Sequence, residues 1–175
     1  QLAFTNHAGI IDYKGRSFFF YHNQDLPRGE GFRRSVCVEE FTYNPDGSIP
    51  LIIPTKEGVK KSVANLNPYQ RVEAETMAWS EGLKTSGNRQ KGVYVTRIEN
   101  GDYLKVRSVD FGNGAKEIEV CIASASESGI IEIRLDNPNG ELIGSLTVKN
   151  TGGWENWKTI KGSLSKVSGV HDVCF

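Results

Sequence analysis

The chain has 175 residues, enough for one sizeable domain or for a small domain joined to part of another. Its 21 lysines and arginines balance 21 aspartates and glutamates, and a net charge of zero argues against nucleic acid, which requires a basic surface. No apolar run approaches the length of a membrane-spanning helix, so we expect no membrane segment. Neither a signal peptide nor an initiating methionine precedes Gln1, and we expect the sequence to be an excerpt of a longer protein.

Residues 1–55 predict short strands joined by tight turns. Lys14-Gly15 is a two-residue hairpin signal, and an Asn-Pro-Asp-Gly turn begins at Asn44. We expect strands over residues 10–13, 17–22, 34–41 and 49–54. About four such strands are the content of one β-propeller blade, and one blade cannot bury both of its faces alone. This block is therefore expected to be the end of a larger domain.

Residues 56–68 are polar, carry three lysines and end in Asn-Pro, a composition typical of an inter-domain connection. From Tyr69 onward, short strands recur with Gly and Asn turns between them, which predicts an all-β sandwich over 69–175. Its strands are expected over residues 71–77, 92–98, 103–109, 117–123, 130–135, 142–148, 157–160 and 170–175. The last apolar run is unfinished at Phe175, so we expect the sandwich to be truncated at its C-terminal end.

The three cysteines, Cys37, Cys121 and Cys174, are odd in number and have no paired spacing. Each lies among apolar residues in a strand-like run. We therefore expect buried free thiols rather than a disulfide framework or a metal site.

Trp154 and Trp157 stand in the stretch TGGWENWKTI, directly after a Gly-Gly turn. Because side chains in a strand alternate between its two faces, the two rings should point opposite ways, one into the core and one outward. An exposed indole suits the apolar face of a sugar ring, whereas the alternative is that both rings serve core or rim packing.

Glu73 and Glu75 are expected to share one face of a strand. Two carboxylates at this spacing can supply oxygen ligands for Ca²⁺, and without a cation they would repel each other. The alternative is a solvent-facing acidic pair on an edge strand.

Residues 69–175 resemble a family 6 carbohydrate-binding module in stretches that follow one another in the right order. The stretches are RVEAETM, VTRIENGDYLKVRSVDFGNGAKEIEV, GIIEIRLDNPNGELIGSL, TGGWENWKTI and VSGVHDVCF. Residues 1–55 resemble the C-terminal end of a family 43 glycoside hydrolase through NHAGIIDYKGRSFFFYHN and GFRRSVCVEEFTYNPDGSIP. The resemblance implies a jelly-roll sandwich preceded by roughly one blade of a five-bladed propeller.

For the module, the resemblance implies that Trp154 stacks on a sugar ring and that Trp157 belongs to the core. Arg97 stands where the family usually has a second aromatic residue; it could stack and donate hydrogen bonds, or it could be a solvated strand end. The family's late sugar-binding Asn would lie beyond Phe175. Glu73 and Glu75 match the place of a structural Ca²⁺.

For the hydrolase-like block, the resemblance implies that the catalytic carboxylates lie in earlier blades, so we expect no catalytic residue in this sequence. His7 matches a histidine near the central channel of the propeller, and Arg34 matches an arginine that reaches the substrate pocket. The alternatives are a structural histidine and an ordinary surface arginine.

The function that follows is non-catalytic binding of a plant cell-wall polysaccharide, xylan or arabinoxylan first and β-glucan second. The module would be monomeric, would be secreted with its parent enzyme, and would hold the attached hydrolase at its substrate. The alternative is that the protein is itself an arabinofuranosidase or β-xylosidase. A third class is a structural or protein-binding sandwich.

Overall fold

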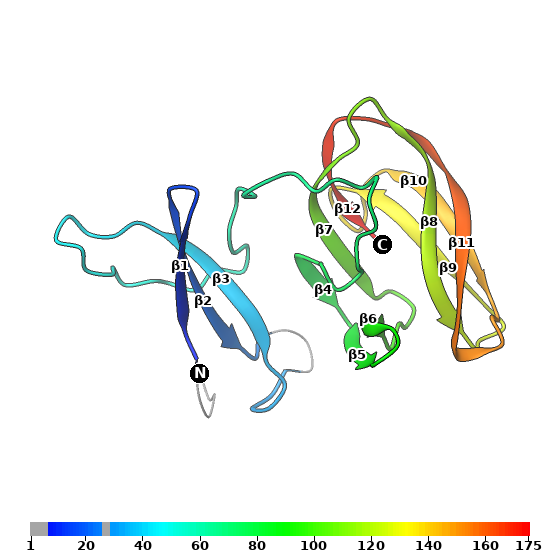
Figure 1. The fold of residues 1–175 in the computed structure, drawn as a ribbon, viewed down its shortest axis with the longest axis horizontal. Coiled ribbons are helices and arrows are strands. Elements are labelled where there is room, and N and C mark those ends of the chain that lie inside the picture. Colours follow the sequence, from blue (N-terminus) through cyan, green and yellow to red (C-terminus); the bar gives the residue numbers. More distant parts are fainter. Residues whose placement is uncertain (1–6, 26–28) are drawn as a thin grey trace. The chain divides into compact units, whose positions relative to one another are not determined.

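The computed structural model describes residues 7–25 and 29–175, and its regular elements are all β-strands. The chain divides into two compact units, Gln1–Val63 and Ala64–Phe175 (Figure 1). The all-β prediction is confirmed, and no helix long and apolar enough to cross a membrane occurs in the described residues.

The first unit is built on a three-stranded antiparallel sheet in the order β1-β2-β3. Its strands are β1 (Gly9–Tyr13), β2 (Arg16–Asn23) and β3 (Ser35–Phe41). Lys14 and Gly15 connect the first two with φ angles of 51° and 72°, the left-handed pair that a tight hairpin turn requires. The predicted hairpin is therefore confirmed.

The strand predicted over 49–54 is wrong, because none of the described strands pairs with this segment. Pro50 and Pro54 lack the N–H groups that a ladder needs. The segment is held at its end by Glu39, a buried carboxylate of β3 that accepts hydrogen bonds from Thr55 N at 2.7 Å and from the Tyr21 hydroxyl at 3.1 Å.

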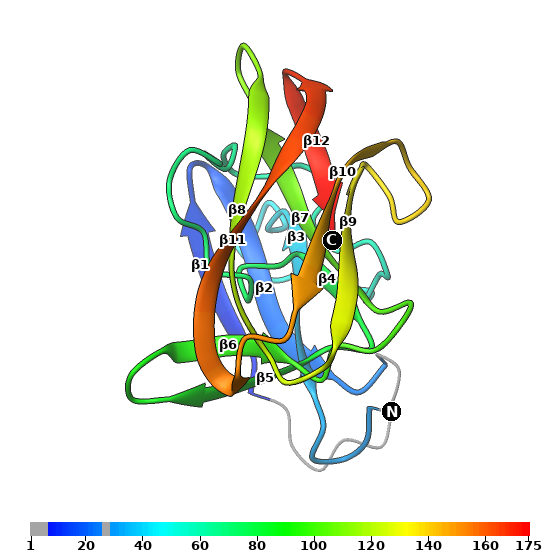
Figure 2. The same ribbon diagram turned by 90° about the vertical axis from the view of Figure 1, so that its right-hand side faces the viewer.

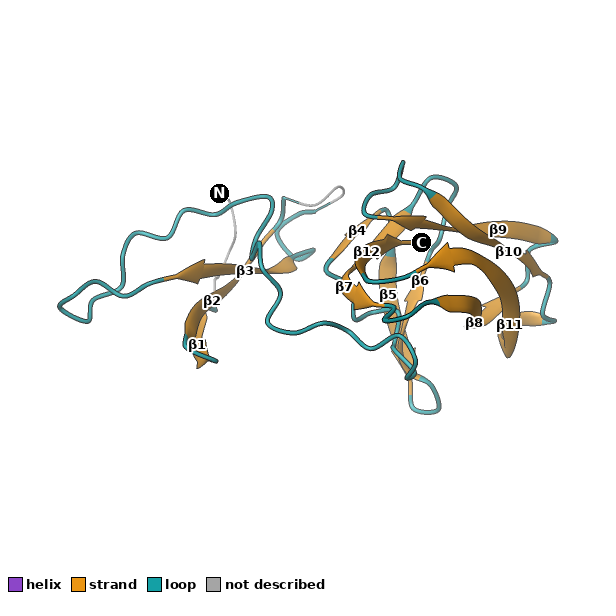
Figure 3. Cartoon of the chain, turned by 90° about the horizontal axis from the view of Figure 1, so that it is seen from above, coloured by secondary structure: helices purple, strands orange, loops and turns teal. Residues whose placement is uncertain are grey.

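The second unit contains a seven-stranded sheet in the order β4-β7-β12-β9-β10-β11-β8 and a separate hairpin of two strands. The sheet strands are β4 (Trp79–Glu81), β7 (Tyr103–Asp110), β8 (Ala115–Ser124), β9 (Ser128–Leu135), β10 (Leu142–Lys149), β11 (Gly153–Val167) and β12 (Val170–Cys174). The hairpin strands are β5 (Lys84–Asn88) and β6 (Gly92–Thr96). Figure 3 shows the sheet curling into a sandwich.

The core lies inside this curl. Its buried cluster comprises Val106, Val109, Phe111, Ile133, Leu135, Ile143, Leu146, Val167 and Val173. Partly buried side chains of β8 and β11, among them Val120 and Ile160, pack against that cluster, so the two ends of the sheet share one interior. Gly144 makes this closure possible where β10 meets β11, because a Cβ atom there would lie 3.0 Å from the Ser163 carbonyl oxygen.

The strand predicted over 71–77 is wrong, and the sequence patterns missed β4 and β5. Residues 71–73 have no regular structure, and Thr76 N donates to Glu73 O at 2.9 Å in a turn. Glu73 and Glu75 therefore do not share a strand face. The cysteine prediction holds in part: all three thiols are free and Cys174 is buried, but Cys37 is only half-buried and Cys121 is exposed.

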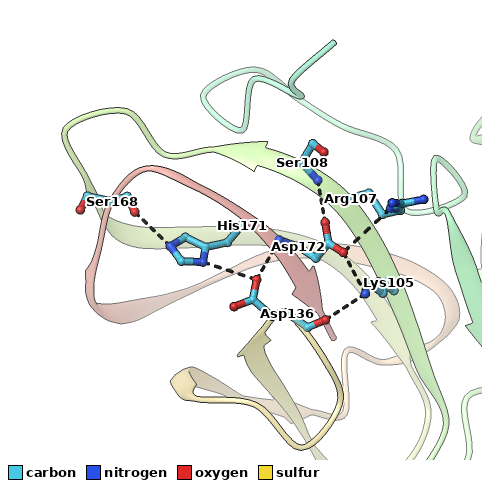
Figure 4. Close-up of polar contacts among 7 residues, drawn as sticks. All are labelled: Lys105, Arg107, Ser108, Asp136, Ser168, His171 and Asp172. Carbon is cyan, nitrogen blue, oxygen red and sulfur yellow. Dashed lines mark hydrogen bonds and ion pairs between the residues drawn. The ribbon is translucent and has the colours of Figure 1, made fainter. Parts of the chain in front are cut away.

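Asp172 of β12 is the polar centre that joins β12, β7 and the turn after β9 (Figure 4). Its carboxylate pairs with Lys105 Nζ at 2.8 Å and accepts a hydrogen bond from Ser108 N at 3.0 Å, where a bulge in β7 leaves that N–H outside the ladder. Asp136 accepts a hydrogen bond from the Asp172 backbone and lies 3.4 Å from the His171 ring.

Replacing Asp172 with Asn should destabilise the second unit by about 1–3 kcal/mol, the usual cost of losing a hydrogen-bonded charge. Burial alone would raise the pKa of the Asp172 carboxyl, but the bonds from Lys105 and Ser108 outweigh it and lower the pKa below its ordinary value. The carboxylate therefore stabilises the fold above the unfolded pKa of about 3.9, and this contribution is lost as the pH falls through the folded pKa.

Urea unfolding at neutral pH and at pH 3 measures both effects. The difference in free energy of unfolding between the native chain and Asp172→Asn should be smaller at pH 3 than at neutral pH. Glu127→Gln, an exposed acid of the same unit, should change stability by less than about 0.5 kcal/mol. A pH-independent difference would contradict the assignment.

Candidate functional site

The loop between β10 and β11 is fastened to the end of β8 by Thr151, whose exposed fraction is 4%. Thr151 N donates to Ser124 O at 2.8 Å, and Thr151 Oγ1 accepts from Ser124 N at 2.9 Å. Asn150 adds a side-chain bond to Ala125 O at 2.8 Å. Hydrogen bonds thus hold the loop to the end of β8 just before Trp154.

Immediately after this anchor the ladder between β11 and β8 loses its regular register. Gly153 pairs with Ser124 and Lys158 pairs with Ile122, so five steps along β11 match only two along β8. Residues 154–157, which include both tryptophans, have no regular register with β8, so simple strand alternation does not predict which way their side chains point. Trp154 lies on this irregular segment with 66% of its surface exposed, as predicted for the outward ring.

Trp157 is not a core residue, which corrects the prediction. It is half-buried, and within the described residues it belongs neither to the core cluster nor to the side chains packed against it. Its ring instead meets the Tyr94 ring edge-on at a centroid distance of 5.1 Å, and Lys91 Nζ lies 5.0 Å over the same ring. The register shift explains the error, because the prediction assumed a regular strand.

The β5–β6 hairpin supplies both of these partners. Figures 1 and 2 show it at the same end of the sandwich as the loop that enters β11. The sequence pointed to Arg97 as the second residue of the site and assigned no role to Tyr94 or Lys91. Period-2 alternation through Val93, Tyr94 and Val95 identifies the strand, but only the tertiary contact shows what its aromatic ring touches.

Arg97 follows β6 directly and is exposed. Its φ of 55° is left-handed, a strained conformation for a residue with a side chain. The turn that follows is closed by Asp102, whose carboxylate accepts a hydrogen bond from Glu99 N at 3.0 Å. The structure brings Tyr94 rather than Arg97 into contact with Trp157, and a ligand role for Arg97 stays a prediction.

Glu73 and Glu75 lie at a turn, and Glu73 has a cationic partner. Arg71 occupies both oxygens of Glu73, through Nε at 2.7 Å and Nη2 at 3.1 Å, and this pairing lowers the pKa of Glu73. Across residues 7–25 and 29–175, no group of three or more His, Cys, Asp or Glu side chains is placed to hold a metal ion. The calcium assignment stays a prediction.

His7 and Arg34 lie in the first unit, at the same end of its sheet. The His7 backbone N–H donates to the His22 ring at 3.4 Å, and the two rings meet edge-on at 6.2 Å. Arg34 is exposed and precedes Ser35, which pairs with Asn23. Their proposed hydrolase roles stay predictions.

Replacing Thr151 with Val should lower the free energy of unfolding by about 1–3 kcal/mol, because the buried Ser124 N–H loses its hydrogen-bond acceptor. Thr151→Ser retains the hydroxyl and should lose less. Urea unfolding measures the cost, and Thr147→Val, an exposed threonine in the middle of β10, is the matched control. Equal effects at Thr151 and Thr147 would show that the loop is not anchored as described.

Comparison with known proteins found relatives of both units. Residues 73–175 match the family model described as carbohydrate binding module (family 6). A family 6 carbohydrate-binding module from Clostridium cellulolyticum, solved in complex with xylose, is 40% identical with a TM-score of 0.61, covering 63% of this chain and 85% of that one.

Two longer relatives extend the similarity to the first unit. An arabinoxylan arabinofuranohydrolase of Paenibacillus polymyxa is 36% identical over 97% of this chain and 28% of its own length. The solved glycoside hydrolase family 43 arabinoxylan arabinofuranohydrolase from Bacillus subtilis, in complex with cellotetraose, is 38% identical with a TM-score of 0.81, over 97% of this chain and 37% of that one. The chain thus spans well under half the length of either arabinofuranohydrolase.

Proposed function

Because the chain belongs to carbohydrate-binding module family 6, we propose that its second unit binds a plant cell-wall polysaccharide without cleaving it. Xylan is the preferred ligand, and β-glucan is the alternative. The observation that carries this proposal is the exposure of Trp154, a large apolar ring that a buried anchor and a register shift hold out of the core. A pyranose laid on that ring would bury apolar area on both partners.

The choice of glycan is supported by what the relatives bind or cleave. The Clostridium cellulolyticum module was solved with xylose, and the two longer relatives are named as arabinoxylan hydrolases. The cellotetraose in the Bacillus subtilis structure is the reason to retain β-glucan as the alternative. Since such polymers lie outside the cell, we also propose that the protein acts extracellularly.

The first unit resembles part of a family 43 hydrolase, so we propose that the module serves an attached enzyme by keeping it at its substrate. Among the described residues of this unit, the two carboxylates of β3 are both engaged by other groups and are not available as a general acid and a general base. Glu39 is buried and bonded to Thr55 and Tyr21, and Glu40 pairs with Arg16 at 2.6 Å.

The 175-residue chain should therefore release no arabinose from arabinoxylan. Product analysis after prolonged incubation measures this. Release that survives purification would show that the chain itself is an enzyme.

Trp154→Ala should reduce retention by xylan at least about tenfold, because stacking on an indole adds on the order of 1 kcal/mol to the apolar area buried. Affinity electrophoresis in gels with and without xylan measures the change. Ile130→Ala, at a side chain with 72% exposure in the same unit, is the control and should leave retention unchanged. Unchanged retention for Trp154→Ala would remove this ring from the site.

A further inference from the structure

The β5–β6 hairpin carries an unbalanced charge. Residues 82–98 contain four cations, Lys84, Arg89, Lys91 and Arg97, and no aspartate or glutamate, although the whole chain has a net charge of zero. The imbalance is therefore local.

Several other cations of the unit are paired with acids, as Lys105 is with Asp172, Arg134 with Glu132 and Lys161 with Glu119. Others, such as Lys158 and Lys166, have no ion pair in the described residues, but they are not gathered in one short segment. In the part of the chain that the structure describes, none of the four hairpin cations forms an ion pair with a carboxylate. The hairpin thus presents positive charge that the protein itself does not neutralise.

Lys91 brings this charge to the tryptophan segment. Its ammonium lies 5.0 Å over the Trp157 ring and 3.7 Å from the Cys121 sulfur, two weak partners that leave its charge unmatched. One acid lies near Lys91, and another is next to Trp154 in the sequence. Glu73 is close enough for Lys91 to help lower its pKa but is already paired with Arg71, and Glu155 directly follows Trp154.

We propose that the hairpin selects polysaccharides that carry carboxylate groups, such as xylan substituted with uronic acids, over neutral chains of the same backbone. The inference rests on the proposed function, because it assigns a substrate class to the site at Trp154. A neutral sugar would stack on the indole, and a carboxylate on a neighbouring residue of the glycan would meet Lys91 or the guanidinium groups of Arg89 and Arg97.

The experiment compares retention by glucuronoxylan with retention by the same polymer after chemical reduction of its carboxyl groups, which leaves the backbone and removes the charge. The native 175-residue chain should be retained more strongly by the acidic polymer, and added salt should reduce the difference. Lys91→Gln should reduce the preference roughly 1.4- to 5-fold, the range for an exposed ion pair. The triple variant at Arg89, Lys91 and Arg97 should abolish it.

Lys166→Gln is the matched control. It removes one exposed cation at the other end of β11, so it alters net charge equally but should leave the preference intact. Glu155→Gln should increase the preference by removing an opposing charge. Equal retention of the two polymers by the native chain, or an equal loss in Lys91→Gln and Lys166→Gln, would overturn the inference.

Trp154→Ala separates this inference from the proposed function. If Trp154→Ala is retained by neither polymer and the native chain prefers the acidic polymer, the proposed function and the role of the hairpin are both supported. Loss on both polymers without any preference in the native chain refutes only the hairpin's role. Full retention of Trp154→Ala on the reduced polymer refutes the stacking site itself.

Discussion

The site depends on one break in a β-ladder. Between Gly153 and Lys158 the strand β11 has more residues than its partner β8 can pair, so the excess residues lack regular partners on β8. Thr151, bonded to Ser124 just before the break, fixes where the excess begins. An exposed tryptophan loses hydrophobic stabilisation, and this anchored irregularity is the reason that Trp154 does not fold back into the core.

The two tryptophans consequently have different surroundings, although they are three residues apart. Trp154 is open to solvent, whereas Trp157 is covered by Tyr94 and Lys91 from the hairpin. Because a two-stranded hairpin is marginally stable by itself, these contacts on Trp157 also support β5 and β6. Trp157 therefore helps to hold the charged hairpin at the end of the sandwich where the loop that carries Trp154 enters β11.

Features that depend on local sequence could be predicted, and those that depend on tertiary pairing could not. The Lys14-Gly15 hairpin and the long strands of the sandwich follow from turn residues and alternation, and the family resemblance identified the exposed ring. The strand over 71–77 failed because alternation reports which residues could face a core but not whether a neighbouring strand is available. The prediction for Trp157 was wrong because it assumed regular strand alternation, which does not hold across a register shift. Lys91 was missed because a cation in a hairpin turn has no signal until its neighbours are known.

We propose that Trp154, rather than Trp79 or Trp157, is the tryptophan that meets the sugar. Each indole N–H gives its own resonance in a two-dimensional ¹H–¹⁵N spectrum, so Trp79, Trp154 and Trp157 can be followed separately during titration with a xylo-oligosaccharide. We expect the Trp154 resonance to shift most, the Trp157 resonance to shift less through its neighbours, and the Trp79 resonance on β4 to stay in place. A dominant shift at Trp79, or saturation with no shift at Trp154, would contradict this proposal.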